Sequence, residues 1–151
     1  MEWIIFAGVA FLVTMQMVPL KRWKILWPLG LVAMLLIYFI DNTLIGLKAF
    51  AYSSVSPVIS GIPIPYLISG FPGGILLGYF CPRELWPRSL YILLAAFVFL
   101  VLELIMFWLG HFYYINWSPV KSFFLNVGGF TVFIWVTDWL GVLRNKEAFF
   151  E

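Results

Sequence analysis

Five stretches of mainly apolar residues dominate the sequence, and each is about as long as a helix that crosses a bilayer. A transmembrane helix needs about 20 such residues to cover the hydrocarbon core. Charged or turn-forming residues separate the stretches, so each one predicts a separate helix. The predicted spans are residues 3–20, 25–46, 62–80, 89–109 and 122–143.

The composition indicates the same class of protein. Hydrophobic residues make up 64% of the 151-residue chain and charged residues 11%, with a mean hydropathy of +1.02. A soluble domain has about 45–50% apolar and about 25% charged residues, so it could not hide this much apolar surface from water. We therefore predict an all-α membrane protein, a single transmembrane domain of residues 1–151 built as a bundle of five helices.

The distribution of basic residues predicts the orientation, because cytoplasmic loops collect Lys and Arg. With five spans and the N-terminus outside, only Lys48 and Lys121 of the nine basic residues fall outside. If the third stretch were a re-entrant loop, the two sides would carry nearly equal numbers and the bias would disappear. The sequence therefore predicts a multi-pass protein of the cell membrane with a cytoplasmic C-terminus. The net charge of +2 does not indicate nucleic-acid binding.

The third stretch is the least regular of the five. Pro72 falls near its middle and predicts a helix that is kinked or broken there. Gly70, Gly74 and Gly78 recur every four residues and form a smooth stripe for close helix packing, with Ala95 and Ala96 of the fourth helix as candidate partners. A broken helix at this depth is typical of a binding site, but it also occurs as a plain packing kink.

Acidic residues within the predicted spans are functional candidates, because an ionisable group in the membrane is costly. Asp41 and Glu103 are expected in the external half of the bilayer. Asp138 is expected near the cytoplasmic interface, six residues before Arg144, and is interpreted as an interfacial anchor.

Polar residues near the level of the two external acids predict an external-facing polar pocket. The alternative is structural: Asp41 pairs with Lys48 or Lys121, and Glu103 pairs with His111, only to neutralise charge. The candidate ligand-binding residues are Asp41, Asn42, Lys48, Glu103, His111, Trp117 and Asn126.

Motifs for established chemistries are absent from the sequence. One histidine and one cysteine give no spacing suited to a metal site, so neither a metal nor another cofactor is predicted. The single cysteine, Cys81, forms no intrachain disulfide and is expected to be a packed small hydrophobe. The glycines of the third stretch lack the lysine of a phosphate-binding loop.

Three functions remain open from the sequence. The leading hypothesis is a non-enzymatic protein that binds or translocates a small polar or cationic ligand through the external-facing pocket. The second is a structural or assembly subunit of a larger membrane complex, with a membrane-protein partner or a second copy besides the lipid bilayer. The third is an intramembrane enzyme acting on a lipid-linked substrate, which requires the two acids to lie within about 5–10 Å of each other.

Three short segments carry a resemblance to a known group of proteins. They are Ile40–Asn42, Leu102–Leu104 and Asn116–Trp117, the last of which precedes a tryptophan-bearing final helix. Over about residues 40–140 the chain resembles a family of small uncharacterised polytopic membrane proteins of spore-forming Gram-positive bacteria. The resemblance implies a bacterial cytoplasmic membrane and no particular activity. The positions that it marks for testing are Asp41, Glu103 and Trp117.

Overall fold

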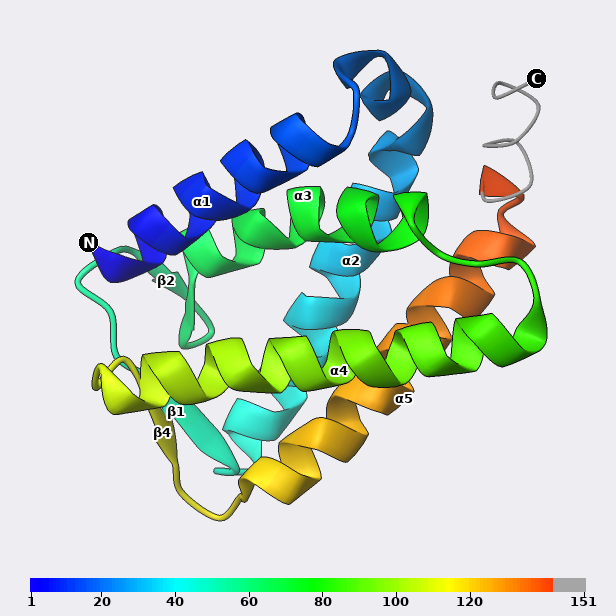
Figure 1. Cartoon of the computed structure of the whole chain (residues 1–151). Coiled ribbons are helices and arrows are strands. Elements are labelled where there is room, and N and C mark those ends of the chain that lie inside the picture. Colours follow the sequence, from blue (N-terminus) through cyan, green and yellow to red (C-terminus); the bar gives the residue numbers. More distant parts are fainter. Residues whose placement is uncertain (143–151) are drawn as a thin grey trace.

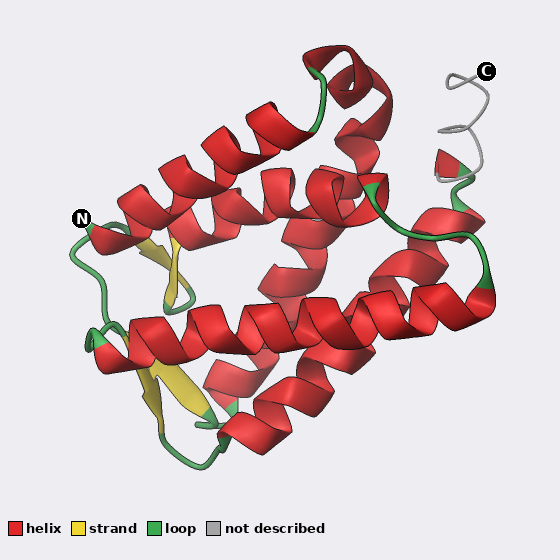
Figure 2. Ribbon diagram, in the orientation of Figure 1, coloured by secondary structure: helices red, strands yellow, loops and turns green. Residues whose placement is uncertain are grey.

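The computed structural model describes residues 1–142, which form five helices and two short two-stranded sheets (Figures 1 and 2). The helices are α1 (Glu2–Met17), α2 (Leu20–Gly46), α3 (Ile64–Tyr79), α4 (Leu85–Trp108) and α5 (Pro119–Trp139). The strands are β1 (Phe50–Tyr52), β2 (Val58–Ile59), β3 (Ile62–Pro63) and β4 (Phe112–Tyr114).

The helices differ in how well their length suits a bilayer. With 27, 24 and 21 residues, α2, α4 and α5 are long and apolar enough to cross a membrane. Helices α1 and α3 have 16 residues each, or about 24 Å at the usual helical rise, against about 30 Å for a hydrocarbon core. The predicted helical fold and membrane class are thus supported by three candidate spans, while the first and third helices are shorter than predicted.

Each helix packs mainly against one or two others. Helix α1 lies on α3, α3 lies on α2, α2 contacts α5, and α5 lies on α4 (Figure 1). Helices α1 and α4 are the two ends of this series and do not pack extensively against each other. The bundle therefore has one side, between α1 and α4, that no helix pair closes.

The connections between helices gather at two ends of the bundle. Strand β1 pairs antiparallel with β4, so the α2–α3 and α4–α5 connections lie side by side. The start of α1 joins them, because the Trp3 indole Nε1 donates a hydrogen bond of 3.0 Å to the Ser53 carbonyl. We call this the strand end. The α1–α2 and α3–α4 turns lie at the other end, where Val18 and Cys81 share one cluster, and we call it the turn end.

A separate hydrophobic core fills each end. The strand-end core contains Trp3, Ala49, Phe50, Ile62, Tyr66, Met106 and Phe112. The turn-end core contains Val18, Leu26, Leu29, Ile75, Cys81, Ile92, Phe133 and Ile134.

The glycine stripe of α3 packs against α2. A Cβ atom added at Gly74 would lie 2.5 Å from the Leu29 carbonyl oxygen, and one added at Gly70 would lie 2.7 Å from Cδ1 of Ile37. These two glycines therefore allow close packing against the second helix. The sequence had suggested the fourth helix instead.

Helix α3 continues through Pro72 from Ile64 to Tyr79, so the predicted break does not occur. The Pro72 carbonyl accepts a hydrogen bond of 3.3 Å from Thr14 Oγ1, a buried hydroxyl of α1. Contacts with α1 at Thr14 and with α2 at Gly74 thus hold this part of α3 from two sides.

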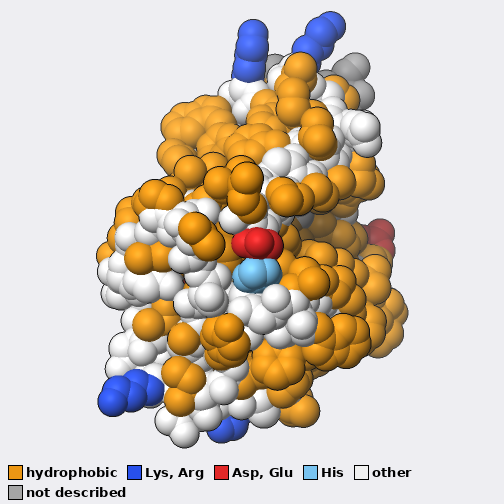
Figure 3. All heavy atoms as spheres, turned by 90° about the vertical axis from the view of Figure 1, so that its left-hand side faces the viewer, with side chains coloured by type: hydrophobic (Ala, Val, Ile, Leu, Met, Phe, Trp, Pro, Cys, Tyr) orange, Lys and Arg blue, Asp and Glu red, His pale blue; other side chains and the backbone are white. Residues whose placement is uncertain are grey.

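The outer surface of the bundle is largely apolar. Large hydrophobic side chains along the helices are well exposed, among them Leu35 (57%), Leu94 (62%) and Trp135 (69%). Figure 3 shows hydrophobic side chains across most of one face, with basic side chains at its upper and lower edges. Such a surface suits lipid, because water would not tolerate this much exposed apolar area.

Candidate functional site

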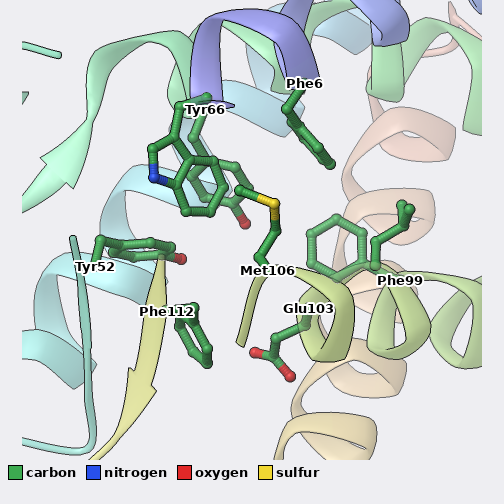
Figure 4. Close-up of a pocket in the computed structure, with 9 residues that line it drawn as sticks. Phe6, Tyr52, Tyr66, Phe99, Glu103, Met106 and Phe112 are labelled. Carbon is green, nitrogen blue, oxygen red and sulfur yellow. The ribbon is translucent and has the colours of Figure 1, made fainter. Parts of the chain in front are cut away.

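An aromatic recess lies at the strand end, where three helices and two strands meet (Figure 4). Its volume is about 320 Å³, including the space at its open side. Six of its nine lining residues are aromatic and one is acidic. They are Trp3 and Phe6 of α1, Tyr52 of β1, Tyr66 of α3, Phe112 of β4, and Phe99, Leu102, Glu103 and Met106 of α4.

Edge-to-face contacts fix the aromatic walls of the recess. The Trp3 ring lies 5.3 Å from Tyr52 and 5.2 Å from Tyr66, at interplanar angles of 75° and 63°. Phe112 lies 5.2 Å from Tyr52 on the adjoining wall. Rings at such distances and angles stabilise one another, so α1, α3, β1 and β4 are joined by one aromatic cluster.

Glu103 is the acidic wall of the recess. Its Oε2 accepts a hydrogen bond of 2.9 Å from the Tyr114 hydroxyl, and its Oε1 accepts one of 3.2 Å from Ser122 Oγ. Ser122 Oγ in turn accepts a hydrogen bond of 2.9 Å from Trp117 Nε1, which ties the predicted Trp117 to the site. Within residues 1–142, Glu103 forms no salt bridge. The carboxylate is therefore oriented by neutral donors while no basic group neutralises it.

Asp41 lies behind the recess and does not line it. Its side chain is buried, and its Oδ2 accepts a hydrogen bond of 2.6 Å from the Tyr52 hydroxyl. The Tyr52 hydroxyl also interacts with that of Tyr66, so both tyrosines link the recess to this second carboxylate. Burial, reinforced by the charge of Asp41, raises the pKa of Tyr52 well above its ordinary value of 10.0. Tyr52 therefore keeps the proton that it donates to Asp41.

Two predicted residues of α2 and its C-terminal turn lie outside the recess. The Asn42 and Lys48 side chains are exposed, and neither lines the recess. The Lys48 backbone takes up a positive φ of 58°, and its carbonyl accepts a hydrogen bond of 3.3 Å from Asn116 Nδ2. Among the described residues Asp41 forms no salt bridge, so its alternative pairing with Lys48 or Lys121 is not observed. Lys121 instead lies 5.6 Å from the Trp117 ring centroid.

His111 pairs with an acid that the sequence had not suggested. Its Nε2 lies 3.8 Å from Oε1 of Glu2, whereas Glu103 binds Tyr114 and Ser122 instead. Figure 3 shows the histidine side by side with an acidic side chain near the centre of one face. This pair joins the start of α1 to the end of α4 immediately beside the recess.

Asn126 lies on α5 and does not line the recess. Its Nδ2 atom is buried and has no hydrogen-bond partner within the described part of the chain. The structure thus brings Glu103 and, through hydrogen bonds, Asp41 and Trp117 to one site, while Asn42, Lys48 and Asn126 stay outside it.

The aromatic lining of the site was not predicted from the sequence. Trp3, Tyr52, Tyr66 and Phe112 lie far apart in the chain, and the pairing of β1 with β4 brings Tyr52 and Phe112 together. A local signal was present, because the α2–α3 and α4–α5 connections contain the aromatic-rich runs Phe50–Tyr52 and Phe112–Tyr114, and aromatic residues favour strands.

Asp138 lies at the turn end, away from the recess. Its Oδ2 lies 2.7 Å from Nη1 of Arg88, in an ion pair that joins the end of α5 to the start of α4. Arg88 Nε also donates a hydrogen bond of 2.9 Å to the Pro82 carbonyl. The interpretation of Asp138 as an interfacial anchor stays a prediction. Arg144, which the sequence analysis placed near Asp138, lies outside the described residues.

Residues 1–142 contain no group of three or more His, Cys, Asp or Glu side chains arranged to hold a metal ion. No protein-family model, curated protein or solved structure matches this chain. The resemblance to membrane proteins of spore-forming bacteria therefore stays a prediction.

Proposed function

We propose that this protein binds a small organic cation in the aromatic recess, with Glu103 as the residue that neutralises the bound charge. The observation that carries the proposal is the position of a carboxylate, without a basic partner in the described chain, among six aromatic side chains. Aromatic ring faces attract cations, and aromatic cages are the usual sites for quaternary ammonium groups.

The charge of the lining disfavours other ligand classes. No lysine or arginine lines the recess, and a second carboxylate, Asp41, lies behind Tyr52. A negatively charged Glu103 would repel an anion. A neutral polar ligand would find few free donors or acceptors, because the Tyr52 hydroxyl is already bonded to Asp41 and the Glu103 oxygens accept from Tyr114 and Ser122.

We also propose that all five helices cross the cell membrane, with the strand end outside. The proposal is supported by the alternation of connections between the two ends and by the basic residues near each end. Lys48 and Lys121 adjoin the strand end, whereas the sequence near the turn end carries Lys21, Arg22, Lys24, Arg83 and Arg88. In this orientation the N-terminus is external, the C-terminus is cytoplasmic, and the recess faces the external half of the bilayer.

Cysteine labelling in intact cells tests this orientation. In a Cys81→Ala background, a membrane-impermeant maleimide should label Lys48→Cys and should leave Lys24→Cys unlabelled until the membrane is opened. The reverse pattern would refute the orientation.

Binding is favoured over translocation by the packing of the opposite end. A route from the recess to the turn end would have to pass a core in which Leu26, Leu29 and Ile75 are almost completely buried. The recess therefore suits a receptor-like binding site on one side of the membrane.

Equilibrium binding of radiolabelled tetramethylammonium to the purified protein in phosphatidylglycerol nanodiscs tests the proposed function. Glu103→Gln should weaken binding at least about tenfold, because a cation in an aromatic site loses its counter-charge. Glu84→Gln is the matched control, since it makes the same change at an exposed position of the chain next to the other end of α4. Equal binding by the wild type and Glu103→Gln, or no binding by the wild type, would refute the proposal.

A further inference from the structure

The side of the bundle between α1 and α4 stays open, and the recess lies on it. The packing series runs from α1 through α3, α2 and α5 to α4, and no further helix pair closes the ring. Trp3 and Phe6 of α1 and four residues of α4 line the recess from the two sides of this seam. From these positions, and resting on the proposed cation site, we infer that the recess opens sideways into the bilayer and takes the head group of a cationic amphiphile.

Access from the strand end is covered by the chain itself. Trp3 is held over the recess by its hydrogen bond to the Ser53 carbonyl, and Phe112 is only 2% exposed. The Glu2–His111 contact of 3.8 Å bridges the same two helices at that end. Figure 3 shows this pair with a hollow beside it. A ligand therefore meets less obstruction along the seam than from the water side.

The α4 wall of the recess continues onto the outer surface. Leu102 lines the recess and is 37% exposed, so it belongs to both surfaces. Val98 lies one turn nearer the turn end on the same helix face and is 50% exposed. Three turns from Leu102, the Tyr91 hydroxyl donates a hydrogen bond of 2.6 Å to the Leu77 carbonyl, which closes α4 onto α3. The open stretch between Leu102 and Tyr91 is thus about 16 Å long.

The α1 wall has a matching apolar face. Phe6 lines the recess, and Val9 and Val13 follow it at intervals of three and seven residues, which places them on the same side of the helix. They are 53% and 38% exposed. Exposed apolar side chains on both helices therefore border the open side of the bundle from the recess toward the turn end, and we call this strip the groove.

The size of the recess supports a ligand that has a small charged head group and a longer apolar chain. The volume of about 320 Å³ counts all the space between the atoms, including solvent at the open side, so the enclosed part of the recess is smaller. In the inferred complex the charged head group lies against Glu103, and the rest of a longer molecule must extend out through the open side of the recess. An alkyl chain lying between α1 and α4 would cover the exposed valines, whereas with a wholly polar cation these valines would stay in contact with lipid.

A chain-length series tests the inference in the same phosphatidylglycerol nanodiscs. The probes are tetramethylammonium and its butyl, octyl and dodecyl analogues, and the measured quantity is the difference in binding between the wild type and Glu103→Gln, which removes general partitioning into lipid. We expect affinity to rise at least about tenfold from tetramethylammonium to the dodecyl analogue, because each buried methylene contributes.

Val98→Trp should fill the groove and cancel the gain in affinity that the alkyl chain of the probe provides. Binding of tetramethylammonium should stay unchanged. Leu93→Trp is the control, since Leu93 is 45% exposed but lies on the α5 side of α4. The sideways opening is refuted if tetramethylammonium binds through Glu103 but a longer alkyl chain adds no affinity. It is also refuted if Val98→Trp does not reduce the affinity that the alkyl chain adds. In both cases the cation site stands. If no probe shows binding that depends on Glu103, both proposals fail.

Discussion

The strand end and the turn end of the bundle are held together by different kinds of side chain. At the turn end, aliphatic residues and close glycine contacts bring α2 and α3 together, and the Arg88–Asp138 ion pair lies at the rim. At the strand end, large aromatic rings enclose two carboxylates that are held by hydroxyl donors.

This difference indicates that the turn end is the scaffold of the bundle and that the strand end is the site. Aliphatic packing stabilises the turn end without any buried acid. The strand end contains Asp41 almost fully buried and Glu103 in a recess, although acids in such surroundings are costly and neutral core residues would stabilise a bundle better. A costly group that is oriented but has no counter-charge indicates a binding role, and the turn end supplies the rigidity that holds it in place.

The largest expected effect is a loss of stability when the close packing of α3 against α2 is disrupted. Gly74→Leu should lower the free energy of unfolding by at least about 2 kcal/mol, because its side chain would collide with the Leu29 carbonyl and with Ala33 Cβ, both less than 3 Å from a Cβ at this position. Thermal unfolding of the purified protein in nanodiscs measures the change.

Gly73→Leu is the matched control for this substitution. Gly73 is the neighbouring residue of α3, and a Cβ added there meets nothing within 4 Å. Equal stability of the two variants would show that the close approach of α3 to α2 does not support the bundle.

An intermediate effect is expected from the hydrogen bond behind the recess. Tyr52→Phe should lower the free energy of unfolding by about 1–3 kcal/mol, because the buried Asp41 carboxylate loses its 2.6 Å donor. Tyr113→Phe removes a hydroxyl that is bonded to the Gly110 carbonyl on the exposed surface, and it should change stability much less. If both variants match the wild type, the polar contacts of the strand end do not contribute as described.

The smallest effect appears at high pH and concerns Tyr52 at the strand end. Burial holds the pKa of Tyr52 above 10.0, so above this pH the unfolded chain loses a proton that the folded chain keeps. Stability should therefore be unaffected below pH 10 and should then fall by up to about 1.4 kcal/mol per pH unit. Unfolding measured between pH 9 and 11 should show a shallower fall for Tyr52→Phe than for the wild type, and identical slopes would contradict this explanation.

The sequence predicted the parts of this architecture that depend on local pattern. Helices α2, α4 and α5 could be recognised because length and hydropathy suffice for a span. Asp41 and Glu103 stood out because few acids occur in such segments, and the structure connects both to one site through Tyr52.

The parts that depend on distant contacts were missed. The pairing of Phe50–Tyr52 with Phe112–Tyr114 brings together segments that no local pattern relates, and the aromatic walls follow from it. The same limit applies to the Glu2–His111 contact and to the choice of α2 as the partner of Gly74. In each case the partner is decided by the packing of the whole bundle.

Locating a bound cation directly tests the central claim that the strand end is a cation site. Crystals of the protein grown with tetramethylarsonium would reveal the ion by the anomalous scattering of arsenic. We expect one strong peak among the aromatic rings beside the Glu103 carboxylate, and its absence from crystals of Glu103→Gln. An empty recess at saturating tetramethylarsonium, or peaks confined to the turn end or the lipid-facing surface, would contradict the claim.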